Sequence, residues 1–247
     1  MDFRAALLDQ TRDFGELIRS ADPSTPVPTC PDWTLQQLFR HVGRGTRWAA
    51  QIITDRRSAP LDPRDVREGK PPDDPDAAID WLNKGAQLVI DGVDRVGQTR
   101  VWTFLGPRPA GWWIRRRLHE VTVHKADAAL AVGGAFDLSP ELAADAISEW
   151  IELMAAQGTP HPPLDVGQSM HLHATDDGLG PTGEWTIVHD ADGVWWSHEH
   201  GKSGVALRGS ATDLLLAITR RRTVAELGLE IFGDDPVWGR WLERTAF

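Results

Sequence analysis

The feature that most constrains this chain is a change of hydrophobic periodicity near residue 158. Before it, apolar residues recur at the three- and four-residue spacings of amphipathic helices. After it, short segments such as MHLHAT alternate apolar and polar residues, which is the pattern of strands. A length of 247 residues accommodates two modest domains. We therefore expect a helical domain over residues 1–157 and a small α+β domain over residues 158–247.

Sequence signals mark the ends of several helices in the first domain. Thr34 and Gln37 form a capping-box pattern at the start of one helix. Another helix is expected over residues 75–96, after a loop rich in proline and charged residues. Gly133 is expected to stop the next helix, and the pair Ser139-Pro140 is expected to open the last one.

The second domain is expected to contain strands in MHLHAT and GVALRG. A hairpin is expected in EWTIVHDADGVWWSHEH, with its turn at Asp190–Gly193. The segments ATDLLLAITRRR and DPVWGRWLERTAF are expected to be helices, and QGTPHPPLD, which begins at residue 157, is expected to be a linker or turn.

The net charge limits the classes of partner that this chain can bind. The chain has 26 Lys and Arg residues against 36 Asp and Glu residues, a net charge of −10, which does not suit a nucleic acid partner. No run of about 18 uncharged apolar residues is present to cross a membrane, and the N-terminal segment lacks the apolar core of an export signal. We therefore expect a cytoplasmic protein that acts on a small molecule, with no nucleic acid and no membrane partner.

Composition also limits the chemistry. The chain has no tyrosine, which excludes a mechanism that needs a phenol. Its single cysteine excludes a disulfide framework and a thiolate-rich zinc site. Acid–base and ligand roles therefore fall to nine histidines, the carboxylates and one thiol.

The helix that ends at Gly133 carries a candidate metal site. At about 100° per residue, His119 and His124 point about 140° apart, whereas Glu120 and His124 are four residues apart and share a face. His41, on the apolar face of the helix that begins at Thr34, is the candidate third ligand. Two histidines and one glutamate form a recognised catalytic zinc site with one open position, and helical bundles commonly hold such sites.

Spacing alone leaves a second interpretation of these residues open. A glutamate and a histidine four residues apart often form a solvated pair or a pair that is satisfied within the core. The metal interpretation has the advantage that one ion would satisfy polar groups on apolar helix faces, where an unpaired polar group is costly to bury.

Four longer segments carry a family resemblance. They are VPTCPDWTLQQLFRHVGR (Val27–Arg44), TFLGPRPAGWWIRRRLHEVTVHKADA (Thr103–Ala128), HLHATDDGLGPTGEW (His171–Trp185) and LRGSATDLLLAITRR (Leu207–Arg221). Together they resemble the mycothiol-dependent maleylpyruvate isomerase family, which belongs to the DinB-like metalloenzymes. The resemblance implies a DinB-like four-helix bundle followed by a small α+β domain similar to sterol carrier proteins. It also implies zinc, or another divalent metal, on His41, Glu120 and His124.

The same resemblance implies a function. Such an enzyme uses mycothiol as its thiol cofactor or co-substrate, and the metal-bound thiolate attacks a small electrophile. The outcome is either cis–trans isomerisation or transfer of the thiol to the electrophile. A noncatalytic metal-binding or stress-associated relative of the same fold is the alternative, and a metal-independent helical interaction module is a more distant one. The intact set of His41, Glu120 and His124 favours the enzyme.

Three further side chains have two interpretations each. Cys30 precedes a helix start, where a thiolate would be favoured, and is either a second nucleophile or, as we expect, a buried packing residue. We place it about two helical turns from His41, too far away to bind its metal. Arg221 is a candidate contact for an anionic substrate or for the thiol cofactor, the alternative being a solvated helix-end cation. Arg117 shares the face of Glu120, and either supports the site or is solvated.

The histidines of the second domain form two pairs, HLH and HEH. His171 and His173 share one strand face, as do His198 and His200, so each pair can chelate a metal. We expect instead that these residues lie on partly exposed hydrophilic faces. Changing His171 and His173 to Gln is therefore expected to leave the metal content unaltered.

Overall fold

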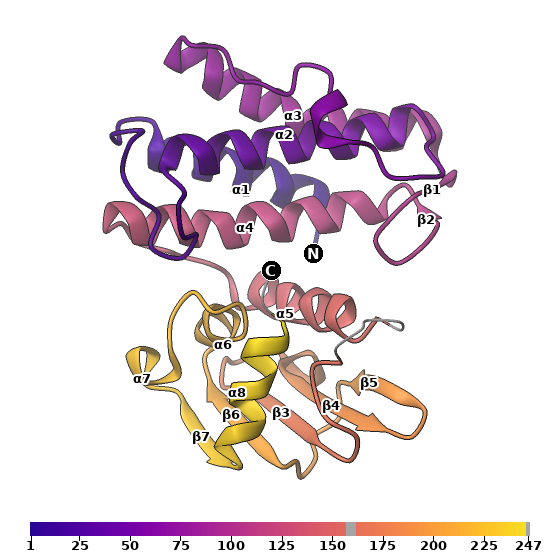
Figure 1. Ribbon diagram of the computed structural model, residues 1–247, viewed down its shortest axis with the longest axis vertical. Coiled ribbons are helices and arrows are strands. Elements are labelled where there is room, and N and C mark those ends of the chain that lie inside the picture. The colour runs from indigo at the N-terminus through magenta and orange to yellow at the C-terminus, as the bar shows by residue number, and fades with distance from the viewer. Residues whose placement is uncertain (157–161, 246–247) are drawn as a thin grey trace. The chain divides into compact units, whose positions relative to one another are not determined.

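The computed structural model describes residues 1–156 and 162–245, which fall into two compact units, Met1–Phe136 and Asp137–Phe247. The boundary expected after residue 157, and the start of the expected linker, lie outside the described residues. The structure thus combines a helical N-terminal unit with a C-terminal unit that contains a sheet (Figure 1).

The N-terminal unit consists mainly of four long helices that lie side by side (Figure 1). Helix α1 packs against α4 and α3, and helix α2 packs against α3 and α4. A short 3-10 helix (Pro63–Asp65) and a small ladder of β1 (Arg100–Val101) and β2 (Arg108–Pro109) lie in the connections. The helices are α1 (Phe3–Ile18), α2 (Leu35–Thr54), α3 (Pro75–Val96) and α4 (Trp112–Val132).

The end signals in the sequence explain where these helices start and stop. The Thr34 hydroxyl accepts a hydrogen bond from the Gln37 amide, and the Gln37 side chain accepts one from the Thr34 amide, which confirms the capping box. Gly133 ends α4 in the left-handed conformation, with φ at 65°. The expected helix over residues 75–96 is confirmed as α3.

The C-terminal unit is built on a five-stranded sheet in the order β5-β4-β3-β6-β7. The central strand β3 pairs antiparallel with β4 and parallel with β6. The strands are β3 (Ser169–Ala174), β4 (Glu184–Asp190), β5 (Gly193–Ser197), β6 (Val205–Gly209) and β7 (Glu230–Gly233). The helices are α5 (Pro140–Met154), α6 (Ala211–Ile218), α7 (Val224–Leu227) and α8 (Asp235–Arg244), with a 3-10 turn at Gly180–Gly183.

Helix α5 belongs with the sheet, although its sequence continues the helical pattern of the first unit. It packs against α6, and its Ser148 hydroxyl accepts a hydrogen bond from Trp185 Nε1 at 2.9 Å. Trp185 is paired with Leu172 across β4 and β3, so both side chains lie on the same face of the sheet. Alternation along β3 therefore directs His171 and His173 to the opposite face.

The connection between β5 and β6 crosses that opposite face. β5 and β6 flank the β4–β3 pair on opposite sides, so residues 198–204 have to pass over β4 and β3. Two contacts tie this segment down: the Thr186 hydroxyl donates to the Glu199 carbonyl at 2.7 Å, and the Gly204 amide donates to Ser169 Oγ at 3.0 Å. We call residues 198–204 the crossing segment.

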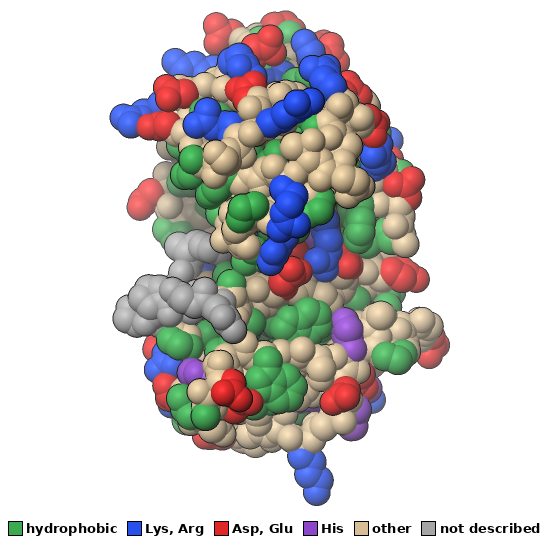
Figure 2. All heavy atoms as spheres, turned by 90° about the vertical axis from the view of Figure 1, so that its right-hand side faces the viewer, with side chains coloured by type: hydrophobic (Ala, Val, Ile, Leu, Met, Phe, Trp, Pro, Cys, Tyr) green, Lys and Arg blue, Asp and Glu red, His purple; other side chains and the backbone are tan. Residues whose placement is uncertain are grey.

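The surface carries charge of both signs. On the face drawn in Figure 2, Lys and Arg side chains of the helical unit lie among Asp and Glu side chains rather than in one continuous basic area. Among the described residues, no helix combines the length and the apolar character that a membrane span requires.

Candidate metal centre in the helical unit

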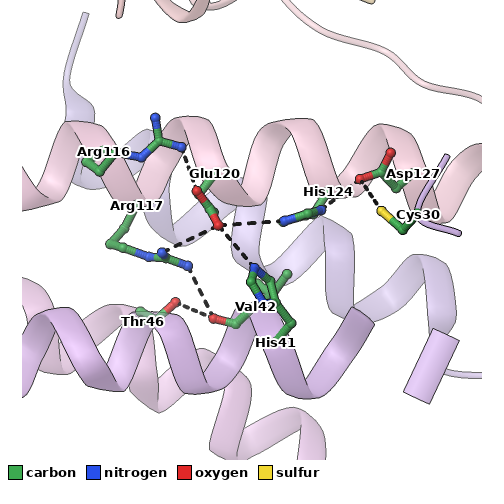
Figure 3. Close-up of polar contacts among 9 residues, drawn as sticks. All are labelled: Cys30, His41, Val42, Thr46, Arg116, Arg117, Glu120, His124 and Asp127. Carbon is green, nitrogen blue, oxygen red and sulfur yellow. Dashed lines mark hydrogen bonds and ion pairs between the residues drawn. The ribbon is translucent and has the colours of Figure 1, made fainter. Parts of the chain in front are cut away.

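Three predicted ligands meet between α2 and α4 (Figure 3). His41 on α2 places its Nε2 3.1 Å from Glu120 Oε1 on α4, and His124 Nε2, one turn further along α4, lies 3.7 Å from the same oxygen. One donor atom from each residue lies within 4.8 Å of the others. The shared face of Glu120 and His124 is therefore confirmed, whereas His119 is absent from this group.

Two arginines neutralise the glutamate from the other side (Figure 3). Arg116 NH2 lies 2.6 Å from Glu120 Oε2, and Arg117 NH1 lies 3.8 Å from Glu120 Oε1. Burial alone would raise the pKa of Glu120, but the charges of Arg117 and Arg116 outweigh it and hold that pKa well below its usual range. The carboxylate is therefore charged and available as a ligand at neutral pH.

Arg117 reaches this position because α2 has a glycine opposite it. The side chain of Arg117 is only 6% exposed, which excludes the solvated alternative. Its NH2 donates to the Val42 carbonyl at 3.5 Å. A Cβ atom at Gly45 would lie 2.7 Å from the same NH2, so a larger residue there would displace the guanidinium.

His124 is oriented by a carboxylate that sequence reasoning missed. Asp127 Oδ2 lies 2.7 Å from His124 Nδ1, which directs His124 Nε2 toward Glu120. Burial opposes a charge on the ring, but hydrogen bonds, first of all with Asp127, outweigh it and raise the pKa of His124 to about 10. By contrast, burial lowers the pKa of His41. Asp127 lies three residues after His124 on the same helix, and residues at this spacing are neighbours, so the spacing could have pointed to this contact.

Cys30 lies nearer to the site than its place in the sequence suggests. Its Sγ donates to Asp127 Oδ2 at 3.5 Å, and Thr29 Oγ1 donates to Asp127 Oδ1 at 2.5 Å. Cys30, Asp127 and His124 form a second possible ligand group, which does not include His41. Cys30 is only half-buried and lies beside the proposed ligand His124, so the expected separation from the site is wrong, because the loop before α2 folds back onto α4.

Trp33 and Arg116 are further neighbours of the site that sequence reasoning did not assign. The ring centroid of Trp33 lies 4.8 Å from that of His41 and 6.4 Å from that of His124. Trp33 directly precedes the Thr34 cap, so the start of α2 places it beside both imidazoles. The ring packs against both imidazoles, while the His41 side chain stays 36% exposed.

Arg221 belongs to the other unit. It follows α6, and its NH1 donates to the Thr219 carbonyl at 2.7 Å. A role of Arg221 in ligand binding stays a prediction.

The donor set of the helical site suits a divalent metal. Imidazole nitrogens and a carboxylate oxygen are ligands of catalytic zinc. Metal-binding histidines commonly use their second ring nitrogen to contact a carboxylate, which is the relation of His124 to Asp127. Because the three donors already converge, His41, Glu120 and His124 are the residues that could hold the ion.

Comparison with known proteins gives these residues a family context. A family model described as the mycothiol maleylpyruvate isomerase N-terminal domain matches residues 4–129, and one described as the MDMPI C-terminal domain matches residues 141–240. Among curated relatives, the uncharacterized proteins MT0763 and Rv0738 of Mycobacterium tuberculosis are each 29% identical over 147 residues, which cover 57% of this chain and 71% of theirs.

Two crystal structures have a similar fold. That of the mycothiol-dependent maleylpyruvate isomerase has a TM-score of 0.59 at 16% identity and covers 87% of this chain and 86% of that chain. That of a histidine-to-alanine mutant of this enzyme has a TM-score of 0.58 at 14% identity, with the same coverage. The two family models together span most of both units, as the sequence motifs suggested. The chain therefore belongs to the mycothiol maleylpyruvate isomerase family.

Proposed function

We propose that this chain is a mycothiol-dependent enzyme whose helical unit holds a divalent metal, zinc in the first place, on His41, Glu120 and His124. The observation that carries the proposal is the convergence of these three donors within 4.8 Å in a chain of this family. Three protein ligands leave zinc one open position, and a thiol bound there loses its proton and becomes a nucleophile at neutral pH.

The surrounding residues have defined tasks in this proposal. Asp127 holds the His124 ring so that Nε2 faces Glu120. Arg116 and Arg117 keep Glu120 ionised and bring positive charge next to the place where an anionic thiolate or substrate would bind. Trp33 packs against the imidazole of His41 and helps to hold its orientation.

The substrate class in this proposal is a small electrophile with a conjugated double bond. The named function of the structural neighbours, maleylpyruvate isomerase, favours cis–trans isomerisation over S-transfer. In isomerisation the thiol adds to the double bond, rotation follows, and the thiol leaves unchanged. A noncatalytic relative would keep the metal but would not turn over an electrophile, so turnover separates the two functions.

Metal content tests the ligands. The full chain, purified without an affinity tag and reloaded with zinc, should lose one equivalent of metal when His41 or His124 is replaced by Ala, because two protein ligands rarely suffice. His189→Gln serves as the control, since His189 lies on β4 of the other unit. An unchanged metal content in both His41→Ala and His124→Ala would exclude this site.

Cobalt substitution tests the thiol. Titrating the cobalt-loaded chain with mycothiol should produce a thiolate-to-cobalt charge-transfer band, which His124→Ala should abolish. Cys30→Ser should leave the band in place, because the proposed sulfur comes from mycothiol. No band at saturating thiol, or a band that depends on Cys30, contradicts the proposal. Equal turnover of the electrophile with and without mycothiol contradicts the enzymatic function as well.

A further inference from the structure

A second cluster of metal-binding side chains lies in the C-terminal unit, on the sheet face away from α5. β3 places His171 and His173 on that face, and β4 places Glu184 directly opposite His173. The crossing segment brings His200 over the same face. One donor atom from each of these four residues lies within 4.8 Å of the others.

Glu184 is the centre of the cluster. Its Oε1 lies 2.8 Å from His173 Nδ1 and 3.3 Å from His200 Nδ1, and its Oε2 lies 2.9 Å from His171 Nε2. The rings of His171 and His200 are edge to face, with centroids 5.0 Å apart. Three imidazoles therefore surround one carboxylate.

The hydrogen bonds of His171 leave one ring nitrogen available. The Thr186 hydroxyl gives its only proton to the Glu199 carbonyl, so it can only accept from His171 Nδ1, which lies 3.0 Å away. In the neutral ring Nδ1 then carries the hydrogen, and Nε2 is a bare acceptor that faces the acceptor Glu184 Oε2.

These two buried atoms are the unusual feature of the cluster. His171 Nε2 and Glu184 Oε2 lie 2.9 Å apart, a distance that suits an ion pair when the ring is protonated, but with a neutral ring neither atom has a donor among the described residues. Two lone pairs that face each other in a buried place are unfavourable, and an ion bound by both removes the conflict. The neighbouring cation on β6, Arg208, is engaged by Glu230 at 2.8 Å.

We propose that His171, His173, Glu184 and His200 form a binding site for a divalent first-row transition metal, for which zinc is the natural probe. Three imidazoles and a carboxylate suit this class of ion, and four ligands complete a tetrahedral zinc shell. Zinc–nitrogen bonds of about 2.0–2.1 Å put tetrahedral ligand atoms about 3.3 Å apart. The contacts to the two Glu184 oxygens, at 2.8–3.3 Å, are on this scale, and one donor atom from each of the four residues lies within 4.8 Å of the others.

The exposure of the ligands provides a route for the ion. The His171 side chain is 4% exposed, Glu184 16%, His173 32% and His200 73%, so the cluster opens toward solvent at His200. Because all four positions of a tetrahedral ion are filled by the protein, the site is structural rather than catalytic. Its effect is to clamp the crossing segment onto β3 and β4.

This proposal reverses the expectation from sequence that the C-terminal histidines play no part in metal binding. His198, which the HEH motif paired with His200, is not part of the cluster. Its Nδ1 lies 2.7 Å from the Glu184 carbonyl, and its ring contacts Trp196. His171 and His173 lie on one face because residues two apart in a strand share a face. His198 and His200 lie in the crossing segment, which is not a strand, so the same spacing does not place them together.

Zinc titration of the full, untagged chain tests the second site separately from the helical one. If both sites exist, the wild type binds two equivalents, and His124→Ala and His200→Gln bind one each. If the helical site fails, the wild type binds one equivalent, which His124→Ala keeps and His200→Gln loses. Zinc binding by His200→Gln and His171→Gln with wild-type stoichiometry and affinity would overturn the proposal.

His200→Gln is the decisive variant because its exposed side chain can change without disturbing the core. We expect its zinc affinity at the second site to fall by at least about 100-fold, more than the loss of an orienting partner costs. Thr186→Val keeps all four ligands but removes the hydrogen-bond partner of His171 Nδ1. We expect it to lower the zinc affinity of the second site by about 10- to 100-fold. His189→Gln on the same strand should bind like the wild type.

Discussion

Gly45 is the residue on which the position of Arg117 depends. A Cβ atom there would lie 2.7 Å from Arg117 NH2, which is too close, but the guanidinium is the flexible end of its side chain. We expect Gly45→Ala to fold and to be destabilised by about 1–2 kcal/mol, since a displaced buried guanidinium costs more than the helix gains from alanine.

The double variant checks the cause. In Gly45→Ala/Arg117→Ala the clash is absent, so the two changes should be non-additive by about 1 kcal/mol in urea unfolding. Gly239→Ala is the matched control, because a Cβ atom at Gly239 meets nothing within 4 Å, and its effect should add to that of Arg117→Ala. Additive effects of Gly45→Ala and Arg117→Ala would show that the two residues do not interact.

Asp127 sets the protonation of His124 in the metal-free chain. The pKa of His124 is raised to about 10, so the charged ring contributes stability fully below its ordinary pKa of 6.5 and loses that contribution as the pH rises through about 10. Asp127→Asn should move this pKa down toward 6.5, which an NMR titration of the ring protons measures. Thr29→Val, which keeps the carboxylate, should leave it raised. An unaltered titration in Asp127→Asn would remove this role from Asp127.

Single residues also show where sequence reasoning reaches its limit. Glu120 and His124 were predictable as a pair because helix geometry fixes which residues share a face. Trp33 and Cys30 were not assigned to the site, because they come from a loop whose path depends on its packing against α4 rather than on a period.

At the scale of elements, the capping box stabilises the first turn of α2. Thr34→Ala removes the acceptor of the Gln37 amide, and we expect it to lower the free energy of unfolding by about 1 kcal/mol. Thr34→Ser keeps an acceptor and should cost less than half as much. Urea unfolding of the three chains measures both differences. Equal losses in the two variants would mean that the hydroxyl is not what caps α2.

Elements with caps or a clear period were predictable, and the shortest ones were not. The turn at Asp190–Gly193 and the helix over residues 75–96 carried such signals, and both are confirmed. Helix α7 and strand β7 have four residues each, too few for a period to appear, although the Thr223–Glu226 capping box of α7 was a signal that sequence reasoning missed. The order of strands, which brings His200 over β3, depends on long-range pairing that no local pattern records.

At the scale of the whole molecule, each ligand cluster draws all its residues from one unit. We therefore expect zinc at the helical site to protect the amides of α2 and α4, and zinc at the second site to protect those of β3 and β4. Hydrogen–deuterium exchange of the full chain with zinc, in the wild type, His41→Ala and His200→Gln, measures this. Loss of protection in β3 and β4 on changing His41 would contradict it.

The change of periodicity near residue 158 comes before β3, the first strand of the C-terminal sheet, and does not coincide with the division between the two units. The described chain divides between Phe136 and Asp137, before α5. A helical period records that a segment is amphipathic, but it does not record which neighbour covers its apolar face. The family models, which end at residue 129 and resume at residue 141, agree with the division of the structure.

The crossing segment also sets an order of assembly for the sheet. The β4–β5 hairpin joins residues that are close in the chain, whereas the parallel β3–β6 pairing joins Met170 to Val205 and needs a long loop to close. We therefore expect the hairpin to form early and the parallel pairing late. His200 lies on the crossing segment, which reaches its final position only when β6 pairs with β3. The four-residue cluster is therefore complete only after this last pairing has formed. If the proposed site holds an ion, we expect that ion to stabilise the pairing that forms last and so to slow unfolding.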